Sequence, residues 1–271
     1  GLALRVAALL TLALAPAPAA AGEPLVPAEY VLIQEGALPV ILAAPHGGRL
    51  PLPGVPERQG KGIKPGPGGF TIGGDTNTDP LARALAAALE ERTGRRPYLV
   101  VARFARKYVD ANRAIETAIE DWKAKPVYDL YHRSLARFCD EVRKTYGHGL
   151  LLDIHGQAAV RDTVLRGTID GVSDDGLVKR FGKRVHAGPE SLAGLIVAHG
   201  IKMSPVDESP EHPAFRGGYT VKTYGEYAGI GAVQLEFGVD FLAKDRIAPT
   251  ASRVADALVD FARRYLSVPA R

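Results

Sequence analysis

The stretch LLLDIHG, residues 150–156, says most about the fold of this chain. Its first five residues are almost continuously apolar, which is typical of a strand covered on both faces of a parallel sheet. His155 and Gly156 follow the apolar residues directly. The stretch therefore predicts a buried central strand with a histidine at its carboxyl end.

Other segments on both sides of this strand alternate between strand and helix patterns. Further strands are expected at residues 30–34, 39–44, 98–103, 163–166 and 231–237, and helices at residues 79–93, 128–146, 175–181, 189–199 and 250–266. Asp79 is expected to cap the first of these helices. The alternation predicts a single α/β domain with a central, mostly parallel (mixed) sheet and helices on both faces.

Composition narrows the possible classes of protein. With 271 residues, of which 46% are hydrophobic and 24% charged, the chain is neither collagen-like, disordered nor a polytopic membrane protein. The net charge of +4 is too small to indicate a nucleic-acid partner. The single cysteine, Cys139, excludes an intrachain disulfide.

The first 21 residues have the pattern of a secretory signal peptide. Arg5 precedes a mostly apolar run from Val6 to Ala15, and the small residues Ala19–Ala21 come before Gly22. The run is too short for a membrane span, which takes roughly 20 apolar residues. A buried N-terminal helix is the alternative. We expect residues 22–271 to form the mature catalytic domain, periplasmic or secreted and without a membrane span.

Two histidines follow apolar strands, and a carboxylate lies near the end of a third strand. His46 follows residues 39–44, His155 follows residues 150–154, and Glu236 lies within 231–237. Ligands of open α/β sheets bind beyond the carboxyl ends of the strands. Two histidines with a carboxylate would leave one coordination position of Zn²⁺ open for water. Taken singly, however, each histidine is more often a hydrogen-bonded loop residue.

Several acidic residues compete for the remaining roles. Burial would raise the pKa of Glu236, which suits a general base, although a structural ion pair is the alternative. Asp153 precedes His155 by two residues, so it faces the same side and either orients that ring or binds metal itself. Asp75 and Asp79 are the other candidate carboxylate ligands.

Six motifs in this order resemble the N-formylglutamate amidohydrolase family. They are PHGGR at 45–49, DTNTDPL at 75–81, ARFARKYVDANR at 102–113, DIHG at 153–156, FRGGYT at 215–220 and VQLEF at 233–237. The resemblance spans about residues 45–240. It implies a fold similar to that of the zinc carboxypeptidases and zinc-dependent cell-wall amidases, with zinc at the strand ends.

The resemblance also implies roles for individual residues. It implies His46, Asp75 and His155 as ligands of one zinc per chain, Glu236 as general base, Arg106 near the oxyanion or the substrate carboxylate, and Asn112, Arg113 and Arg216 as substrate-binding residues. The implied substrate is a small N-acylated amino acid or a peptide-like amide with a free carboxylate.

Two other functions stay open at this point. The expected export favours a peptidoglycan amidase or carboxypeptidase, because cell-wall peptides lie in that compartment. A non-catalytic periplasmic binding protein, with Arg113 as its clamp, is the candidate from another class. The sequence shows no duplication of the kind expected for two closing lobes, which counts against it.

Overall fold

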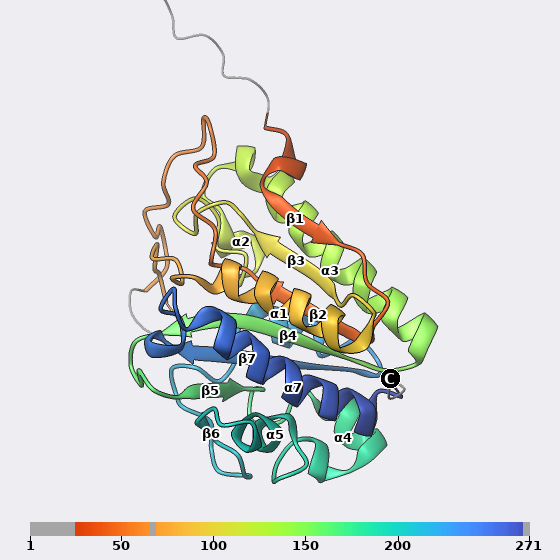
Figure 1. Cartoon of the computed structure of the whole chain (residues 1–271). Coiled ribbons are helices and arrows are strands. Elements are labelled where there is room, and N and C mark those ends of the chain that lie inside the picture. Colours follow the sequence, from red (N-terminus) through yellow and green to blue (C-terminus); the bar gives the residue numbers. More distant parts are fainter. Residues whose placement is uncertain (1–24, 65–68, 268–271) are drawn as a thin grey trace, which may run out of the picture.

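The computed structural model describes residues 25–64 and 69–267. The expected signal peptide, residues 1–21, lies outside the described residues. A central sheet runs through the described part of the molecule, with strand order β1-β3-β2-β4-β7-β5-β6 (Figure 1). Its strands are β1 (Val31–Gln34), β2 (Val40–Ala44), β3 (Tyr98–Ala102), β4 (Gly149–Gln157), β5 (Val164–Gly167), β6 (Met203–Ser204) and β7 (Ile230–Gly238).

The sheet is mixed, and its centre is parallel. Strands β3, β2, β4 and β7 run side by side in parallel, and β5 pairs in parallel with β6. Only the pairs β1–β3 and β5–β7 are antiparallel within the described sheet. The carboxyl ends of β2, β4 and β7 therefore meet at one edge. The predicted fold class is confirmed.

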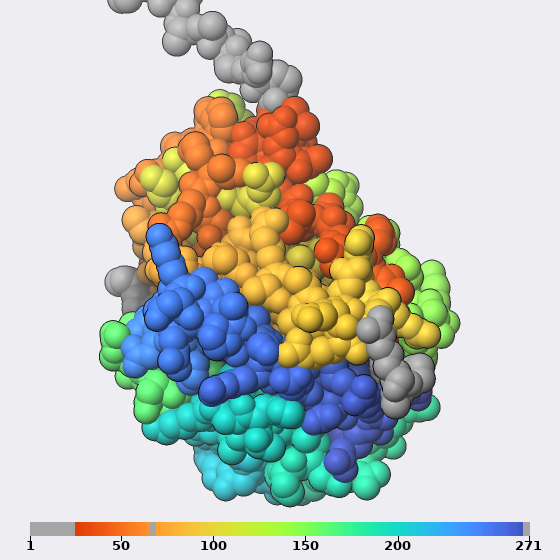
Figure 2. Space-filling view, viewed as in Figure 1, coloured from red at the N-terminus to blue at the C-terminus, as the bar shows by residue number. Residues whose placement is uncertain are grey.

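Helices cover both faces of this sheet. One face packs against α1 (Thr78–Thr93), α4 (Asp175–Phe181), α5 (Leu192–Ala198) and α7 (Ile247–Tyr265). The other packs against α2 (Ile115–Ala118), α3 (Lys125–Tyr146) and α6 (Tyr219–Tyr224). Short 3-10 turns occur at Pro27–Glu29, Trp122–Ala124, Lys183–Val185 and Val239–Phe241. In Figure 2, α7 in dark blue lies directly beside α1 in amber across the first face.

The alternation of side chains along the central strands decides which residues can meet. Leu150, Leu152 and Ile154 of β4 face the core under α1 and α7, so Asp153 and His155 point to the opposite side. Residues 233, 235 and 237 of β7 also face the α1 side. Polar side chains of two neighbouring strands therefore share the α3–α6 face near the carboxyl edge.

Two details differ from the sequence prediction. The cap of α1 is Asn77, not Asp79, so that prediction was wrong. Asn77 has a left-handed conformation with φ of 61°, which asparagine tolerates better than most residues, and the helix begins at Thr78. Strand β4 also runs on to Gln157, so His155 lies within the strand rather than after it.

None of the described helices is both long enough and apolar enough to cross a membrane.

Candidate metal and catalytic site

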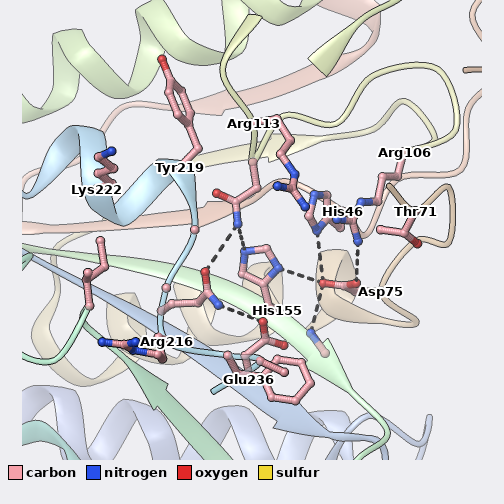
Figure 3. A pocket seen from close by; sticks show the side chains of 18 of the residues that line it. His46, Thr71, Asp75, Arg106, Arg113, His155, Arg216, Tyr219, Lys222 and Glu236 are labelled. Atoms are coloured by element: carbon pink, nitrogen blue, oxygen red, sulfur yellow. Dashed lines mark hydrogen bonds and ion pairs between the residues drawn. The ribbon is translucent and has the colours of Figure 1, made fainter. Parts of the chain in front are cut away.

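A cavity of about 1020 Å³ opens at the carboxyl edge of the central strands. All eight side chains singled out by the sequence line it: His46, Asp75, Arg106, Asn112, Arg113, His155, Arg216 and Glu236. They come from β4, β7, the loops after β2 and β3 and the segments before α1 and α6. Figure 3 shows His46, Asp75 and His155 directed toward one another. The tertiary structure therefore brings every predicted site residue to one place.

Three of these side chains converge as a possible metal site. His46 Nδ1 lies 3.5 Å and His155 Nδ1 lies 3.0 Å from the same oxygen, Oδ2 of Asp75. One ligand atom from each residue falls within 4.8 Å of the others, and among the described residues no other such group is found. Nitrogen and oxygen donors at this spacing suit a divalent cation.

In both histidines, the Nε2 atom contacts a buried carboxylate. His46 Nε2 lies 2.7 Å from Oδ1 of Asp110, and His155 Nε2 lies 2.9 Å from Oδ2 of Asp153. Histidines that bind metals usually donate their other ring N–H to such a group, which fixes the ring and its tautomer. His46 Nδ1 is buried and has no hydrogen-bond partner in the described chain, as expected of a nitrogen reserved for a metal. The donor set therefore fits a metal ion.

The competing carboxylates have other contacts. Asp153 touches the side of the His155 ring that faces away from Asp75, so it orients the ring. Asp79 forms an ion pair with Arg83 one turn along α1 and lies outside the converging group. Asp75 is thus the carboxylate in position to be a ligand.

The backbone around His46 and Asp75 is packed too closely for larger residues. A Cβ on Gly47 would lie 2.3 Å from the backbone nitrogen of Asp79, where α1 begins. The N–H of Asp75 donates to the carbonyl of His46 at 2.9 Å, and Oδ2 of Asp75 accepts from the N–H of Gly156 at 3.1 Å. The loop after β2, the start of α1 and the end of β4 are therefore locked together.

The charges of the site stabilise one another. Burial opposes ionisation of Asp75, but the neighbouring His46 and His155 outweigh it and hold the pKa of that carboxyl far below its usual range. Burial likewise opposes ionisation of Asp110, yet His46 and Arg106 hold its pKa far below the usual range. Burial disfavours the charged form of His155, but Asp153 and Asp75 raise its pKa well above the ordinary value. The Asp75 carboxylate is therefore anionic over the whole physiological range.

Glu236 behaves in the opposite way. It lies on β7 directly beside His155 of β4, and its side chain is 6% exposed. Burial, reinforced by Asp75 and Asp153, raises the pKa of Glu236 to about 8. A carboxyl group with a pKa near neutrality can both accept and release a proton at working pH. The geometry therefore suits proton transfer next to the metal site.

The three predicted arginines differ in how far they are already paired. Arg106 donates to Oδ2 of Asp110 through two nitrogens, at 3.0 and 2.9 Å, and approaches Oδ1 of Asp75 at 4.0 Å. Arg113 donates to the carbonyl of Gly69 at 2.7 Å. Arg216 forms an ion pair with Asp170.

Tyr219, Lys222 and Gln234 are among the lining residues that the sequence did not single out. Tyr219 and Lys222 lie on α6, which is too short to show a helical pattern in the sequence. The side-chain ammonium of Lys222 has no hydrogen-bond or ion-pair partner in the described ranges 25–64 and 69–267, although its backbone N–H donates to the carbonyl of Gly218. Asp110, whose motif was recognised without a role, turns out to hold the His46 ring.

The similarity of this chain to known proteins is found in its structure and not in its sequence. No protein-family model matches the sequence, and no curated protein matches it. Among solved structures, an N-formylglutamate amidohydrolase from Ralstonia eutropha JMP134 superposes with a TM-score of 0.59 at 16% identity, over 88% of this chain and 98% of that one. The two folds are similar. A gene product of Agrobacterium tumefaciens superposes with a TM-score of 0.52 at 15% identity, over 89% of this chain and 95% of that one.

These likenesses concern the fold. They confirm the architecture expected from the six motifs: a single α/β domain whose fold is similar to that of an N-formylglutamate amidohydrolase.

Proposed function

We propose that this protein is a zinc-dependent amidohydrolase that cleaves an amide bond of a small N-acylated amino acid or a peptide-like amide. One observation carries the proposal: two histidines and an aspartate converge at the cavity beside a buried glutamate on the neighbouring strand. The similarity of fold to an N-formylglutamate amidohydrolase supports the same reaction class.

His46, Asp75 and His155 would hold one zinc ion per chain. Bound there, zinc would supply Lewis-acid stabilisation for the carbonyl oxygen that becomes negative during hydrolysis. With the metal bound, Asp110 and Asp153 would hold each ring with its proton on Nε2, which leaves Nδ1 as the ligand atom.

The residues of this chain would carry the remaining chemistry. Glu236 accepts a proton from the attacking water, whose oxygen forms a bond to the amide carbon. Glu236 then passes the proton to the leaving nitrogen as the carbon–nitrogen bond breaks, so that a carboxylic acid and an amine leave the site. Arg106, held by Asp110 at the edge of the site, would stabilise the negative oxygen together with the metal.

A substrate carboxylate would bind at the cationic wall of the cavity. Arg106 and Arg216 already have carboxylate partners, whereas Lys222 has none among the described residues. Arg113 makes one hydrogen bond to a backbone carbonyl and keeps a wider separation of 3.8 Å from Asp110. Arg113 and Lys222 are therefore the cations we assign to substrate carboxylates.

The size of the cavity favours one second candidate. At about 1020 Å³ it lies at the upper end of the range for drug-sized ligands, so a peptide-like substrate would fit. Together with the signal-peptide pattern in residues 1–21, this supports an exported peptidoglycan amidase or carboxypeptidase as the alternative. A periplasmic binding protein remains a third reading, but it gives no reason for a buried glutamate beside the metal group.

Metal analysis and substrate assays on purified protein test the proposal. We expect about one zinc per chain and release of amine from N-formylglutamate, or from muropeptides if the alternative is correct. His46→Ala and His155→Ala should lose both metal and activity. His199→Ala is the matched control, because His199 pairs with Asp260 away from the cavity. Protein that is purified in the presence of zinc, yet retains none and cleaves neither substrate, would overturn the proposal.

A further inference from the structure

We infer that Gln234 is a positioning residue that aims the carboxylate of Glu236, and that Asn112 sets the direction in which Gln234 donates. The inference rests on the proposed function, because it assigns Glu236 the proton transfer. It gives Asn112 a different task from the substrate binding that the sequence resemblance implies.

The first link joins two residues of one strand. Gln234 and Glu236 are two positions apart on β7, so their side chains lie on the same face. Nε2 of Gln234 donates to Oε1 of Glu236 at 2.9 Å, and both residues are buried, with 4% and 6% exposed. The terminal torsion of a glutamate is broad and has no sharp preference of its own. The hydrogen bond to Oε1 is therefore what leaves Oε2 available to the cavity.

The second link fixes which end of the Gln234 amide faces Glu236. Nδ2 of Asn112 lies 3.4 Å from Oε1 of Gln234, in the order donor to acceptor. Oδ1 of Asn112 in turn accepts from the backbone N–H of Thr220 at 2.8 Å. A backbone N–H can only donate, so it determines the orientation of Asn112, and Asn112 determines that of Gln234.

The N–H of Thr220, at which this chain of hydrogen bonds begins, has no partner within its own helix. Thr220 is the second residue of α6, and the first N–H groups of a helix have no partner within the helix. Asn112 supplies that partner from the loop after β3. The chain of hydrogen bonds runs Thr220 N–H to Asn112, Asn112 to Gln234, and Gln234 to Glu236. Figure 3 draws the last two of these links as dashed lines beside His155 and Glu236.

His155 reinforces this direction. Nδ2 of Asn112 is also 3.1 Å from Nε2 of His155. When Nδ1 of His155 serves as a ligand, Nε2 carries the ring proton and donates it to Asp153. Nε2 then has no lone pair to offer the Asn112 amide, so Oε1 of Gln234 is the acceptor that remains for Nδ2.

Asn112 packs closely against the backbone of Gly218. A Cβ on Gly218 would lie 2.2 Å from Nδ2 of Asn112. Three motifs that are far apart in the sequence, DANR, FRGGYT and VQLEF, thus meet in one hydrogen-bonded chain that ends on the general base. Both ends of the Asn112 amide have protein partners, so a substrate carboxylate would have to displace one of them.

The test is a comparison of Gln234→Leu and Asn112→Ala with the zinc-loaded wild-type enzyme. We expect kcat to fall roughly tenfold to a hundredfold for Gln234→Leu, the scale of a misplaced catalytic group, while KM changes less than about threefold. Zinc content should stay near one per chain. The double variant should be no slower than Gln234→Leu alone, because both changes break the same chain.

Gln157→Leu is the matched control. Gln157 is also a buried glutamine, on β4, but its amide donates to the carbonyls of Val160 and Thr163 instead of the catalytic glutamate. The Gln157→Leu variant should lose thermal stability, while its kcat should stay close to that of the wild-type enzyme. If Gln234→Leu does not fold, Asn112→Ala carries the same prediction with the strand intact.

Two outcomes would overturn the inference: a Gln234→Leu enzyme with kcat within twofold of wild type, or one in which KM alone rises. An inactive wild-type protein would instead count against the proposed function. In that event, crystal structures of wild type and Gln234→Leu decide the inference, which expects the Glu236 carboxylate to rotate in the variant. An unchanged carboxylate would refute it.

Discussion

Glu236 keeps its proton to higher pH than an exposed glutamate because it is buried among other carboxylates. Replacing it by glutamine preserves its shape and its contact with Gln234 but removes the group that accepts the proton. We expect Glu236→Gln to bind zinc as wild type does and to lose about 10²- to 10⁴-fold in kcat. Steady-state kinetics with metal analysis checks this, and full activity in the variant would remove Glu236 from the mechanism.

Lys222 is the cavity cation without a partner among the described residues, so its charge is available to a substrate. Lys222→Met keeps the aliphatic stem and removes the charge. We expect KM to rise roughly three- to tenfold for a substrate with a free carboxylate, since an exposed charged contact contributes modestly. KM should not change for the corresponding substrate in which a carboxamide replaces the free carboxylate. Lys179→Met, at an exposed residue paired with Asp175, is the control; equal effects from both variants would argue against a substrate contact.

At the scale of elements, α3 meets α6 through a histidine enclosed by tyrosines. The His132 ring lies among Tyr128, Tyr131, Tyr219 and Tyr224, and its Nδ1 is 2.9 Å from the hydroxyl of Tyr224. Burial lowers the pKa of His132 to about 4. The packing of these two helices therefore depends on an uncharged imidazole.

The sign of the pH effect follows from proton binding. Between pH 6.5 and about 4 the unfolded chain binds a proton at His132 that the folded protein does not. Stability from this residue is therefore complete above pH 6.5 and is lost as pH falls, by up to roughly 3 kcal/mol. Urea unfolding of metal-free protein at pH 7 and pH 4.5 measures it. His132→Gln should reduce this pH dependence and His199→Gln should not; identical profiles for His132→Gln and wild type would contradict the assignment.

The junction between β2 and α1 depends on a close backbone approach. Gly47→Ala would drive its Cβ against the Asp79 backbone and shift the neighbouring His46. We expect a loss of about 1–3 kcal/mol in the free energy of unfolding, together with weaker zinc affinity. Gly73→Ala is the control, since its Cβ would meet nothing closer than 3.8 Å. Calorimetric metal titration separates the two variants, and wild-type affinity in Gly47→Ala would show that the junction can relax.

For the whole molecule, the metal should act as a clamp between distant parts of the chain. The three residues that would hold it lie after β2, before α1 and within β4, so binding would tie these segments together only in the folded state. At a zinc concentration a hundredfold above Kd, linkage predicts about 2.7 kcal/mol of added stability. Thermal unfolding with zinc and with a chelator tests this. His155→Ala should show no zinc-dependent rise in Tm; a rise equal to wild type would place the metal elsewhere.

The architecture was predictable because its signals are local and periodic. The run at residues 150–154 indicated a doubly covered strand, and β4 lies at the centre of the sheet with α1 and α7 on one side and α3 on the other. The start of α1 was misplaced because Asn77 adopts a left-handed conformation, a backbone choice that propensity does not specify. Helix α6 was not predicted because six residues are too few to show a period.

His46, His155 and Glu236 could be chosen from sequence because each follows or ends a strand, and the carboxyl ends of parallel strands share an edge. The other five candidates rested on the family resemblance, and all eight line the same cavity. Their division of labour could not be read there. Asp153 and Asp75 have the same side chain; only the folded chain puts one behind the His155 ring and the other in front of it. The same holds for Asn112, whose amide is turned by the free N–H of α6. Periodicity and residue type are properties of short segments, whereas hydrogen-bond direction and burial depend on neighbours more than forty residues away and exist once the sheet has assembled.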